Sequence, residues 1–196
     1  MSEKASDVKQ HLLSTQPGFE LVLLEQDHVD PLTPSGLDPI EALPRIVMRQ
    51  MLSLQASKTI ISRVEARAAE QGVRIAQLSY DDLLECGLSR NKAIAVGAIE
   101  AYWQQSREKM QQWPLLDCDD LLREVQQIKG VGPWSASILA MFHFAHEDLF
   151  PIQDSSLRKA IALLKERDVI IIPERATPYR SYLACYLWQL LDQKRI

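Results

Sequence analysis

The sequence predicts an all-α protein, for three reasons. Apolar residues recur at helical spacing through most of the 196 residues. The one β-like run, Ile170–Ile172, is too short for a sheet. No internal repeat or low-complexity linker interrupts the helical pattern. A chain of this length can bury a sizeable core, and we expect residues 1–37 to pack as an N-terminal segment on a domain formed by residues 38–196.

A cap residue and a proline mark the start of the first predicted helix. Asp38 suits the N-cap and Pro39 the first helical position, although Pro44 is an irregularity that would delay the start. The apolar spacing then predicts two helices that are broken near Ser53–Ser57, with Gly72 ending the second. The apolar positions are Ile46, Val47, Met51, Leu54, Ile60, Ile61, Val64 and Ala68.

Serine and aspartate mark the later helix starts. Ser79 and Ser89 are suitable caps for a short helix and for a longer one that reaches Trp103. Asp154, or the serine after it, would open another helix through Leu164. These signals complete an element order that is helical throughout.

The segment Ile128–Ala136, which reads Ile-Lys-Gly-Val-Gly-Pro-Trp-Ser-Ala, predicts a tight hairpin between two helices. Gly130 and Gly132 can take backbone angles closed to other residues and leave their amides uncovered. Pro133 suits a first helical position. Outward amides at a helix N-terminus favour a phosphate anion. The flanking apolar positions are Leu121, Leu122, Val125 and Ile128 before the turn and Ala136, Leu139, Ala140 and Phe142 after it.

The net charge of −4 at first argues against a nucleic-acid partner. Residues 1–50 carry 4 basic and 8 acidic side chains, whereas residues 51–196 carry 18 of each. The acidic excess therefore lies outside the hairpin-bearing part. A hairpin that holds phosphate through amides also needs fewer lysines, so the charge lowers non-specific affinity without excluding DNA.

Composition also bears on the compartment. No run of about 18 apolar residues is present, and the polar stretch Met1–Gln10 is unlike a signal peptide. The three cysteines, Cys86, Cys118 and Cys185, are widely spaced among apolar neighbours, which favours buried thiols in a reducing compartment. We expect a cytoplasmic, nucleoid-associated protein in a bacterium or a nuclear protein in a eukaryote.

Four segments, in order, resemble the DNA glycosylase superfamily named for its helix-hairpin-helix, its Gly/Pro-rich loop and its downstream aspartate. They are Arg49–Ser53, in which Met51 departs from the Gln-Gln-Leu-Ser pattern, Gly87–Ala93, the hairpin with Phe150–Asp154, and Pro178–Trp188. The resemblance covers nearly the whole chain and is nearest the inducible bacterial type of 3-methyladenine DNA glycosylase, in a compact form without the N-terminal β domain. It implies two helical lobes with the active-site cleft between them, and a monomer that acts on double-stranded DNA with a damaged base and not on membranes.

The resemblance implies that Asp154, twenty residues after Trp134, is the catalytic carboxylate. By itself, Asp154 is as well explained as a helix N-cap, and the two roles are compatible. A carboxylate beside the anomeric carbon stabilises an oxocarbenium-like sugar and helps to deprotonate water. Bifunctional relatives carry a lysine at position 134 that forms a Schiff base. Trp134 therefore implies a monofunctional glycosylase without lyase activity.

The same resemblance places Trp188, Trp134 and Ile138 in the base pocket, with core packing as the alternative for the two tryptophans. An indole face holds cationic purines of the 3-methyladenine and 7-methylguanine type, whose charge also makes them good leaving groups. Ile138 replaces an aromatic residue of the nearest relatives' pocket. A glycosylase for a deaminated or oxidised purine therefore stays open, as does a catalytically silent damaged-DNA-binding module, against which Asp154 argues.

A flipped base leaves a gap that a wedge side chain fills. The resemblance implies Met51, with Gln50, as the wedge; a buried methionine on a helix is the alternative for Met51. It also implies phosphate contacts at Gly130, Gly132, Ser135 and Lys129.

Three cysteines are too few for the four-cysteine iron–sulfur cluster of some relatives. The resemblance implies only a structural Na⁺ or K⁺, held by the backbone carbonyls of Gln126, Ile128 and Val131.

Overall fold

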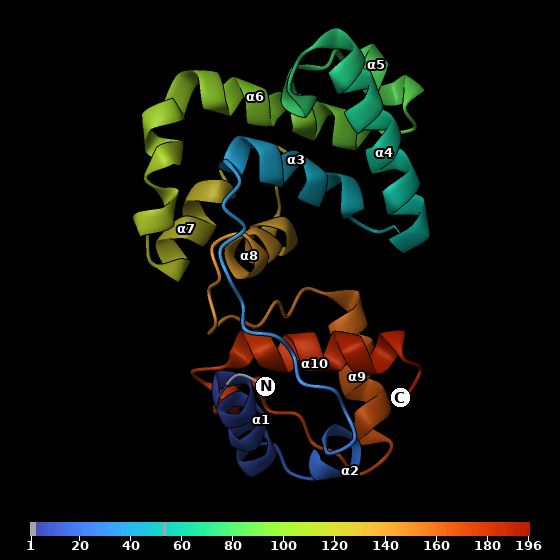
Figure 1. The fold of residues 1–196 in the computed structure, drawn as a ribbon, viewed down its shortest axis with the longest axis vertical. Helices are drawn as coiled ribbons and strands as arrows, with labels where there is room; N and C mark the ends of the chain where they lie inside the picture. The colour runs from blue at the N-terminus through green and yellow to red at the C-terminus, as the bar shows by residue number, and fades with distance from the viewer. Residues whose placement is uncertain (1–2, 53) are drawn as a thin grey trace. The chain divides into compact units, whose positions relative to one another are not determined.

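The computed structural model describes residues 3–52 and 54–196, and every regular element in those residues is a helix (Figure 1). The all-α prediction is confirmed. The chain forms two compact units: one is residues 35–144, and the other combines residues 1–34 with residues 145–196. In the described ranges, no helix is both long enough and apolar enough to cross a bilayer.

The unit of residues 35–144 is built around the buried helix α3 (Pro39–Arg49), which packs against α4, α6 and α8 (Figure 1). Helices α7 and α8 pack on each other. The bounds of the other elements are α4 (Leu54–Gln71), η1 (Ile75–Gln77), α5 (Tyr80–Glu85), α6 (Arg90–Gln111), η2 (Trp113–Leu115), α7 (Cys118–Val125) and α8 (Pro133–Phe142).

Helix α3 begins at Pro39, as predicted. The amides of Glu41 and Ala42 both donate to the carbonyl of Asp38, at 2.8 and 3.1 Å. The expectation that Pro44 delays the start is wrong, because Pro44 lies buried inside the helix. Proline removes one backbone donor there, and the burial of the surrounding apolar face outweighs that loss.

A break between two helices is present, but it lies earlier than the predicted Ser53–Ser57, since α3 ends at Arg49 and α4 begins at Leu54; Ser53 itself lies outside the described residues. Ser79 caps α5 by accepting from the amide of Asp82 at 3.1 Å. Helix α6 continues to Gln111, so the expected end near Trp103 is wrong. Its backbone leaves helical geometry only at Ser106, where φ is −137°.

In the other unit, α10 packs on α9 and on the short helix η3, which in turn contacts α1. Helix α9 begins directly after Asp154 and passes Leu164 by one residue, in agreement with the predicted span. Ile170–Ile172 forms no strand in the described chain. The bounds are α1 (Glu3–Thr15), α2 (Glu20–Leu23), α9 (Ser155–Lys165), η3 (Pro173–Ala176) and α10 (Arg180–Asp192).

Helix α1 is not among the predicted elements. Its buried residues, Ala5, Val8 and Leu12, follow helical spacing between polar neighbours. The segment after α2 is held to α10, because the amides of Val29 and Leu32 donate to the hydroxyls of Tyr186 and Tyr182, at 3.3 and 3.0 Å. The N-terminal residues are thus a structural part of the unit that contains α9 and α10.

Candidate functional site

The predicted hairpin is present between α7 and α8. Helix α7 ends at Val125, and the amide of Val131 closes the turn by donating to the carbonyl of Ile128 at 3.0 Å. Gly132 is the N-cap of α8, and Pro133 is its first residue. The chain therefore presents the N-terminus of a ten-residue helix directly after the glycine turn.

The two hairpin glycines have different backbones. Gly130 has φ +86°, and a Cβ there would lie 2.5 Å from the Cβ of Ala95. Gly132 has φ −91° and ψ −179°, which any residue adopts, and a Cβ there would meet nothing within 4 Å. Of the two glycines, Gly130 therefore uses the expected backbone freedom, whereas the missing side chain of Gly132 leaves the outer surface of the hairpin uncovered.

The side chain of Ser135 points into the unit and not to solvent. Its side chain is fully buried, and its hydroxyl accepts a hydrogen bond from Gln50 Nε2 at 2.6 Å. The first backbone bond of α8 runs from the amide of Ala136 to the carbonyl of Gly132, so the amide of Ser135 precedes this ladder. Phosphate contact by Ser135 is left to its backbone amide, whereas Lys129 is exposed.

Met51 lies in the loop between α3 and α4, with φ +53° and a fully exposed side chain. A left-handed backbone costs a residue with a Cβ about 1–2 kcal/mol. The alternative of a buried methionine on a helix is excluded. Gln50 is half-buried and donates to Ser135, so of the two wedge candidates Met51 alone projects into solvent.

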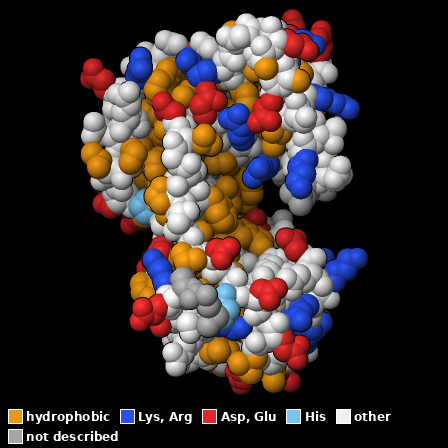
Figure 2. Space-filling model, in the orientation of Figure 1, with side chains coloured by type: hydrophobic (Ala, Val, Ile, Leu, Met, Phe, Trp, Pro, Cys, Tyr) orange, Lys and Arg blue, Asp and Glu red, His pale blue; other side chains and the backbone are white. Residues whose placement is uncertain are grey.

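Acidic residues are absent from three segments that meet in this unit: residues 42–64, 86–99 and 125–146. The segments are brought together where α3 packs on α6 and α8. Figure 2 shows Lys and Arg side chains near the point where α3 ends and α4 begins. Within the described part of the chain, none of these exposed cations takes part in an ion pair: Arg49, Lys58, Arg63, Arg90 and Lys129.

The positions of the acidic residues in the sequence show this charge pattern, whereas the net charge of the whole chain does not. A chain of net charge −4 thus carries exposed cations, without an ion-pair partner among the described residues, on the unit that bears its hairpin and its exposed Met51. Trp134 and Ile138 are half-buried on α8, four positions apart and therefore on one face of the helix.

Asp154 lies in the other unit and is buried, with 9% of its surface exposed. Its Oδ1 accepts from the amide of Leu157 at 2.8 Å, which caps α9, and from the indole Nε1 of Trp188 at 3.2 Å. The predicted capping role is confirmed. The structure also joins two residues, 34 positions apart, that the sequence treats separately.

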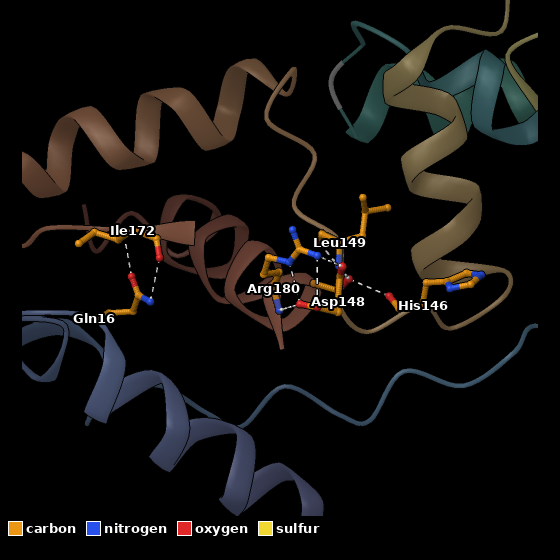
Figure 3. A network of polar contacts seen from close by, with 7 residues as sticks. Gln16, His146, Asp148, Leu149, Ile172 and Arg180 are labelled. Atoms are coloured by element: carbon orange, nitrogen blue, oxygen red, sulfur yellow. Dashed lines mark hydrogen bonds and ion pairs between the residues drawn. The ribbon is translucent and has the colours of Figure 1, made fainter. Parts of the chain in front are cut away.

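The loop that leads to Asp154 is anchored to the start of α10 (Figure 3). Arg180 Nε donates to Asp148 Oδ1 at 2.7 Å, and its Nη2 donates to the Asp148 carbonyl at 2.8 Å. Burial raises the pKa of Asp148, but these hydrogen bonds outweigh it, so the pKa lies below its usual value. The buried Ser181 hydroxyl donates to the carbonyl of His146 at 2.7 Å and accepts from the amide of Leu149 at 3.1 Å.

Figure 3 also shows a second anchor, in which the side chain of Gln16 brackets the backbone of Ile172. Gln16 Nε2 donates to the Ile172 carbonyl at 3.1 Å, and the Ile172 amide donates to Gln16 Oε1 at 2.7 Å. The segments on either side of α9, and the helix that carries Trp188, are therefore held by specific polar contacts.

The three cysteines differ in burial. Cys86 is buried, whereas Cys118 and Cys185 are half-buried, so the expectation of burial holds fully for Cys86 only. Burial raises the pKa of the Cys185 thiol to about 12. Residues 3–52 and 54–196 contain no cluster of three His, Cys, Asp or Glu side chains that could hold a metal ion.

No protein-family model matches the chain. DNA-3-methyladenine glycosylase 1 of Schizosaccharomyces pombe is 26% identical to it over 164 residues, which are 78% of this chain and 72% of that protein. A Schizosaccharomyces pombe 3-methyladenine DNA glycosylase, solved in complex with abasic DNA, superposes with a TM-score of 0.79 at 22% identity and covers 95% of this chain and 97% of that one. The chain is thus similar in sequence to DNA-3-methyladenine glycosylases and shares the fold of solved 3-methyladenine DNA glycosylases.

A second solved structure supports the same fold. The DNA-3-methyladenine glycosidase of Bacillus halodurans superposes with a TM-score of 0.71 at 20% identity, over 97% of this chain and 91% of that one. The match extends over both units of the chain, in agreement with the predicted compact form.

Proposed function

We propose that this chain is a DNA glycosylase of base excision repair that hydrolyses the N-glycosidic bond of alkylated purines of the 3-methyladenine and 7-methylguanine type. One observation carries the proposal: a buried carboxylate, Asp154, accepts hydrogen bonds from a helix amide and from the indole of Trp188. The carboxylate is fixed in place, and an aromatic ring lies beside it.

In this reaction the bond between C1′ and the purine nitrogen breaks, and its electron pair leaves with the base. An alkylated purine is cationic, so it departs neutral and needs no general acid. The Asp154 carboxylate stabilises the oxocarbenium-like sugar electrostatically. It then accepts a proton from the water whose oxygen bonds to C1′, and releases that proton to solvent.

The hairpin supplies the grip on DNA. A phosphate would accept from the amides at the start of α8, over the uncovered surface of Gly132, with Lys129 nearby in sequence. The segments without acidic residues favour a polyanion on the same unit. Met51 would fill the gap left by the flipped base, because of the two wedge candidates, Gln50 and Met51, it is the one whose side chain is exposed.

We expect base release to depend on both the face and the N–H of the Trp188 ring. Trp188→Phe keeps stacking but loses the donor to Asp154, so excision of 7-methylguanine should fall about tenfold. Trp188→Ala also loses the aromatic face, and its rate should fall further for cationic bases than for the uncharged hypoxanthine. Single-turnover excision assays on matched duplexes measure both. Parental rates in the alanine variant would remove Trp188 from the base pocket.

The strand should remain intact after base removal. Trp134 stands where a lysine nucleophile would be needed, so the product should be an abasic site, and borohydride should trap no protein–DNA adduct. Denaturing gels with and without alkaline treatment measure strand cleavage. A trapped adduct that disappears in Lys129→Ala would assign lyase chemistry to Lys129 and contradict the monofunctional proposal.

The substrate class is tested by incubating the protein with alkylated genomic DNA and identifying the released bases by mass spectrometry. Release of 3-methyladenine or 7-methylguanine is the expected result. Because Ile138 offers no aromatic ring, the matched substrate set includes DNA with hypoxanthine and with 8-oxoguanine. Release of only these bases would move the activity to a deaminated or oxidised purine. Tight binding to lesions without release would indicate a damage-binding module.

A monovalent cation at the hairpin is part of the proposal. In the described chain, no backbone amide donates to the carbonyls of Gln126 and Val131, and the Ile128 carbonyl accepts only from Val131. A carbonyl has two lone pairs, so all three oxygens keep a lone pair free of backbone hydrogen bonds for an Na⁺ or K⁺, which would add positive charge next to a bound phosphate. We propose that the protein acts as a monomer where the cell keeps its DNA.

A further inference from the structure

We infer that Lys92 is a positioning residue that holds the loop of Met51 in its wedge conformation and couples that loop, through Gln50, to the phosphate-binding end of α8. The inference rests on the proposed function, because it gives the exposed Met51 a task on DNA. It assigns to Lys92 no contact with the substrate.

Lys92 lies on the first turns of α6 and reaches across to the end of α3. Its ammonium donates to the carbonyls of Met48 and Gln50, at 2.9 and 2.6 Å. Since α3 ends at Arg49, these carbonyls belong to the helix end, where a cation is favourable. The side chain is half-buried, and this burial lowers the pKa of its ammonium. Lys92 is therefore a structural contact between α6 and the end of α3 and not a fully solvated surface charge.

The second contact of Gln50 continues this chain of bonds. While its carbonyl accepts from Lys92, its Nε2 donates to the fully buried hydroxyl of Ser135, at 2.6 Å. Ser135 stands in the first turn of α8, and its amide precedes the helix ladder. One residue, Gln50, is therefore bonded to α6 through its backbone and to α8 through its side chain.

Met51 is the residue directly after this double anchor. A non-glycine residue with φ +53° persists only where its surroundings hold it. The side chain of Met51 is fully exposed, so its own packing supplies no restraint. The turn around Met51 is closed by the amide of Leu52, which donates to the Arg49 carbonyl at 3.3 Å, and the bonds from Lys92 and Ser135 to Gln50 fix the direction in which this turn leaves the helix.

The test is Lys92→Met, which keeps most of the length of the unbranched side chain and removes its donors. We expect excision of 7-methylguanine from duplex DNA to fall between tenfold and a hundredfold, on the order of the loss from misplacing a group by about 1 Å. Excision from the lesion-bearing strand alone should stay within about twofold of the parental rate, because a single strand leaves no gap in a duplex for a wedge to fill. With the parent protein, we expect the fluorescence of a 2-aminopurine placed next to the lesion to rise on binding, because the base unstacks. With Lys92→Met, this rise should be absent.

Controls separate bracing from charge. Lys109→Met removes an exposed lysine from the same helix α6, outside the segments without acidic residues, and should leave the duplex-to-single-strand ratio unchanged. If Lys92 instead bound a phosphate, Lys92→Met would weaken binding to undamaged duplex DNA. It would also reduce the slope of log affinity against log salt concentration by about one. That result would overturn the inference. Equal losses on both substrates would also overturn it.

A second variant covers the case in which Lys92→Met does not fold. Ser135→Ala removes only the acceptor of Gln50 and should give the same substrate dependence in weaker form. A Ser135→Ala protein with the parental duplex-to-single-strand ratio and the parental fluorescence rise would refute the coupling. Unstacking does not require base release, so the fluorescence tests the positioning role of Lys92 even if the parent protein cleaves no bond. A parent protein that unstacks the base but releases none would refute only the proposed function.

Discussion

Replacing Asp154 with asparagine should lower the rate of base release by two or more orders of magnitude while DNA affinity and folding stay close to parental. The change removes a charge next to a developing cation, and losses of such electrostatic stabilisation are on this scale. Asparagine keeps an Oδ1 that can accept from Leu157 and Trp188. Single-turnover excision, filter binding and thermal unfolding measure the three quantities.

Asp154→Ala is the matched control for the capping role. It loses the acceptor as well as the charge, and should cost about 1 kcal/mol of stability. Both variants should be equally inactive, since activity depends on the charge, and only the alanine variant should unfold earlier. An asparagine variant with near-normal turnover would leave Asp154 as a helix cap alone.

The two hairpin glycines should respond to substitution in opposite ways. Gly130→Ala should lower the free energy of unfolding by about 3 kcal/mol, because it combines a left-handed backbone with a Cβ that would lie 2.5 Å from that of Ala95. Gly132→Ala should leave stability within about 0.5 kcal/mol, since its backbone is ordinary and the space around it is open. Denaturant unfolding of the two variants gives the comparison.

For DNA, Gly132 is the sensitive position. Gly132→Asp places a negative charge at the N-terminus of α8 and should weaken binding to any duplex on the order of tenfold, damaged or not, because phosphate contacts carry no sequence information. Circular dichroism should show a parental fold. If a folded Gly132→Asp protein binds undamaged DNA as the parent does, the hairpin is not the phosphate site.

The elements that the sequence predicts well carry local signals. Pro39, Asp154 and the Gly-Val-Gly-Pro turn each set the backbone within a few residues, and the structure has helix starts or a turn at all of them. Helix α6 passes Trp103 because the polar stretch that follows contains no proline or glycine to stop it.

The features that escape prediction depend on distant partners. Buried residues of α1 acquire their partners only when the end of the chain folds against them, and the same is true of the bond between Asp154 and Trp188. Lys92 looks like an ordinary surface lysine until the end of α3 is placed beside it. A Gly-x-Gly pattern also cannot show which glycine has the positive φ, since that depends on the approach of Ala95.

The order of the two units along the chain has a consequence for biosynthesis. Residues 35–144 form a continuous unit, so all of its contacts are available while the last 52 residues, 145–196, are still being translated. The first 34 residues must wait for those last ones. A ribosome that stalls before residue 145 would therefore release a chain that has the proposed phosphate-binding hairpin but lacks Asp154 and Trp188, so this fragment would repair no DNA that it bound.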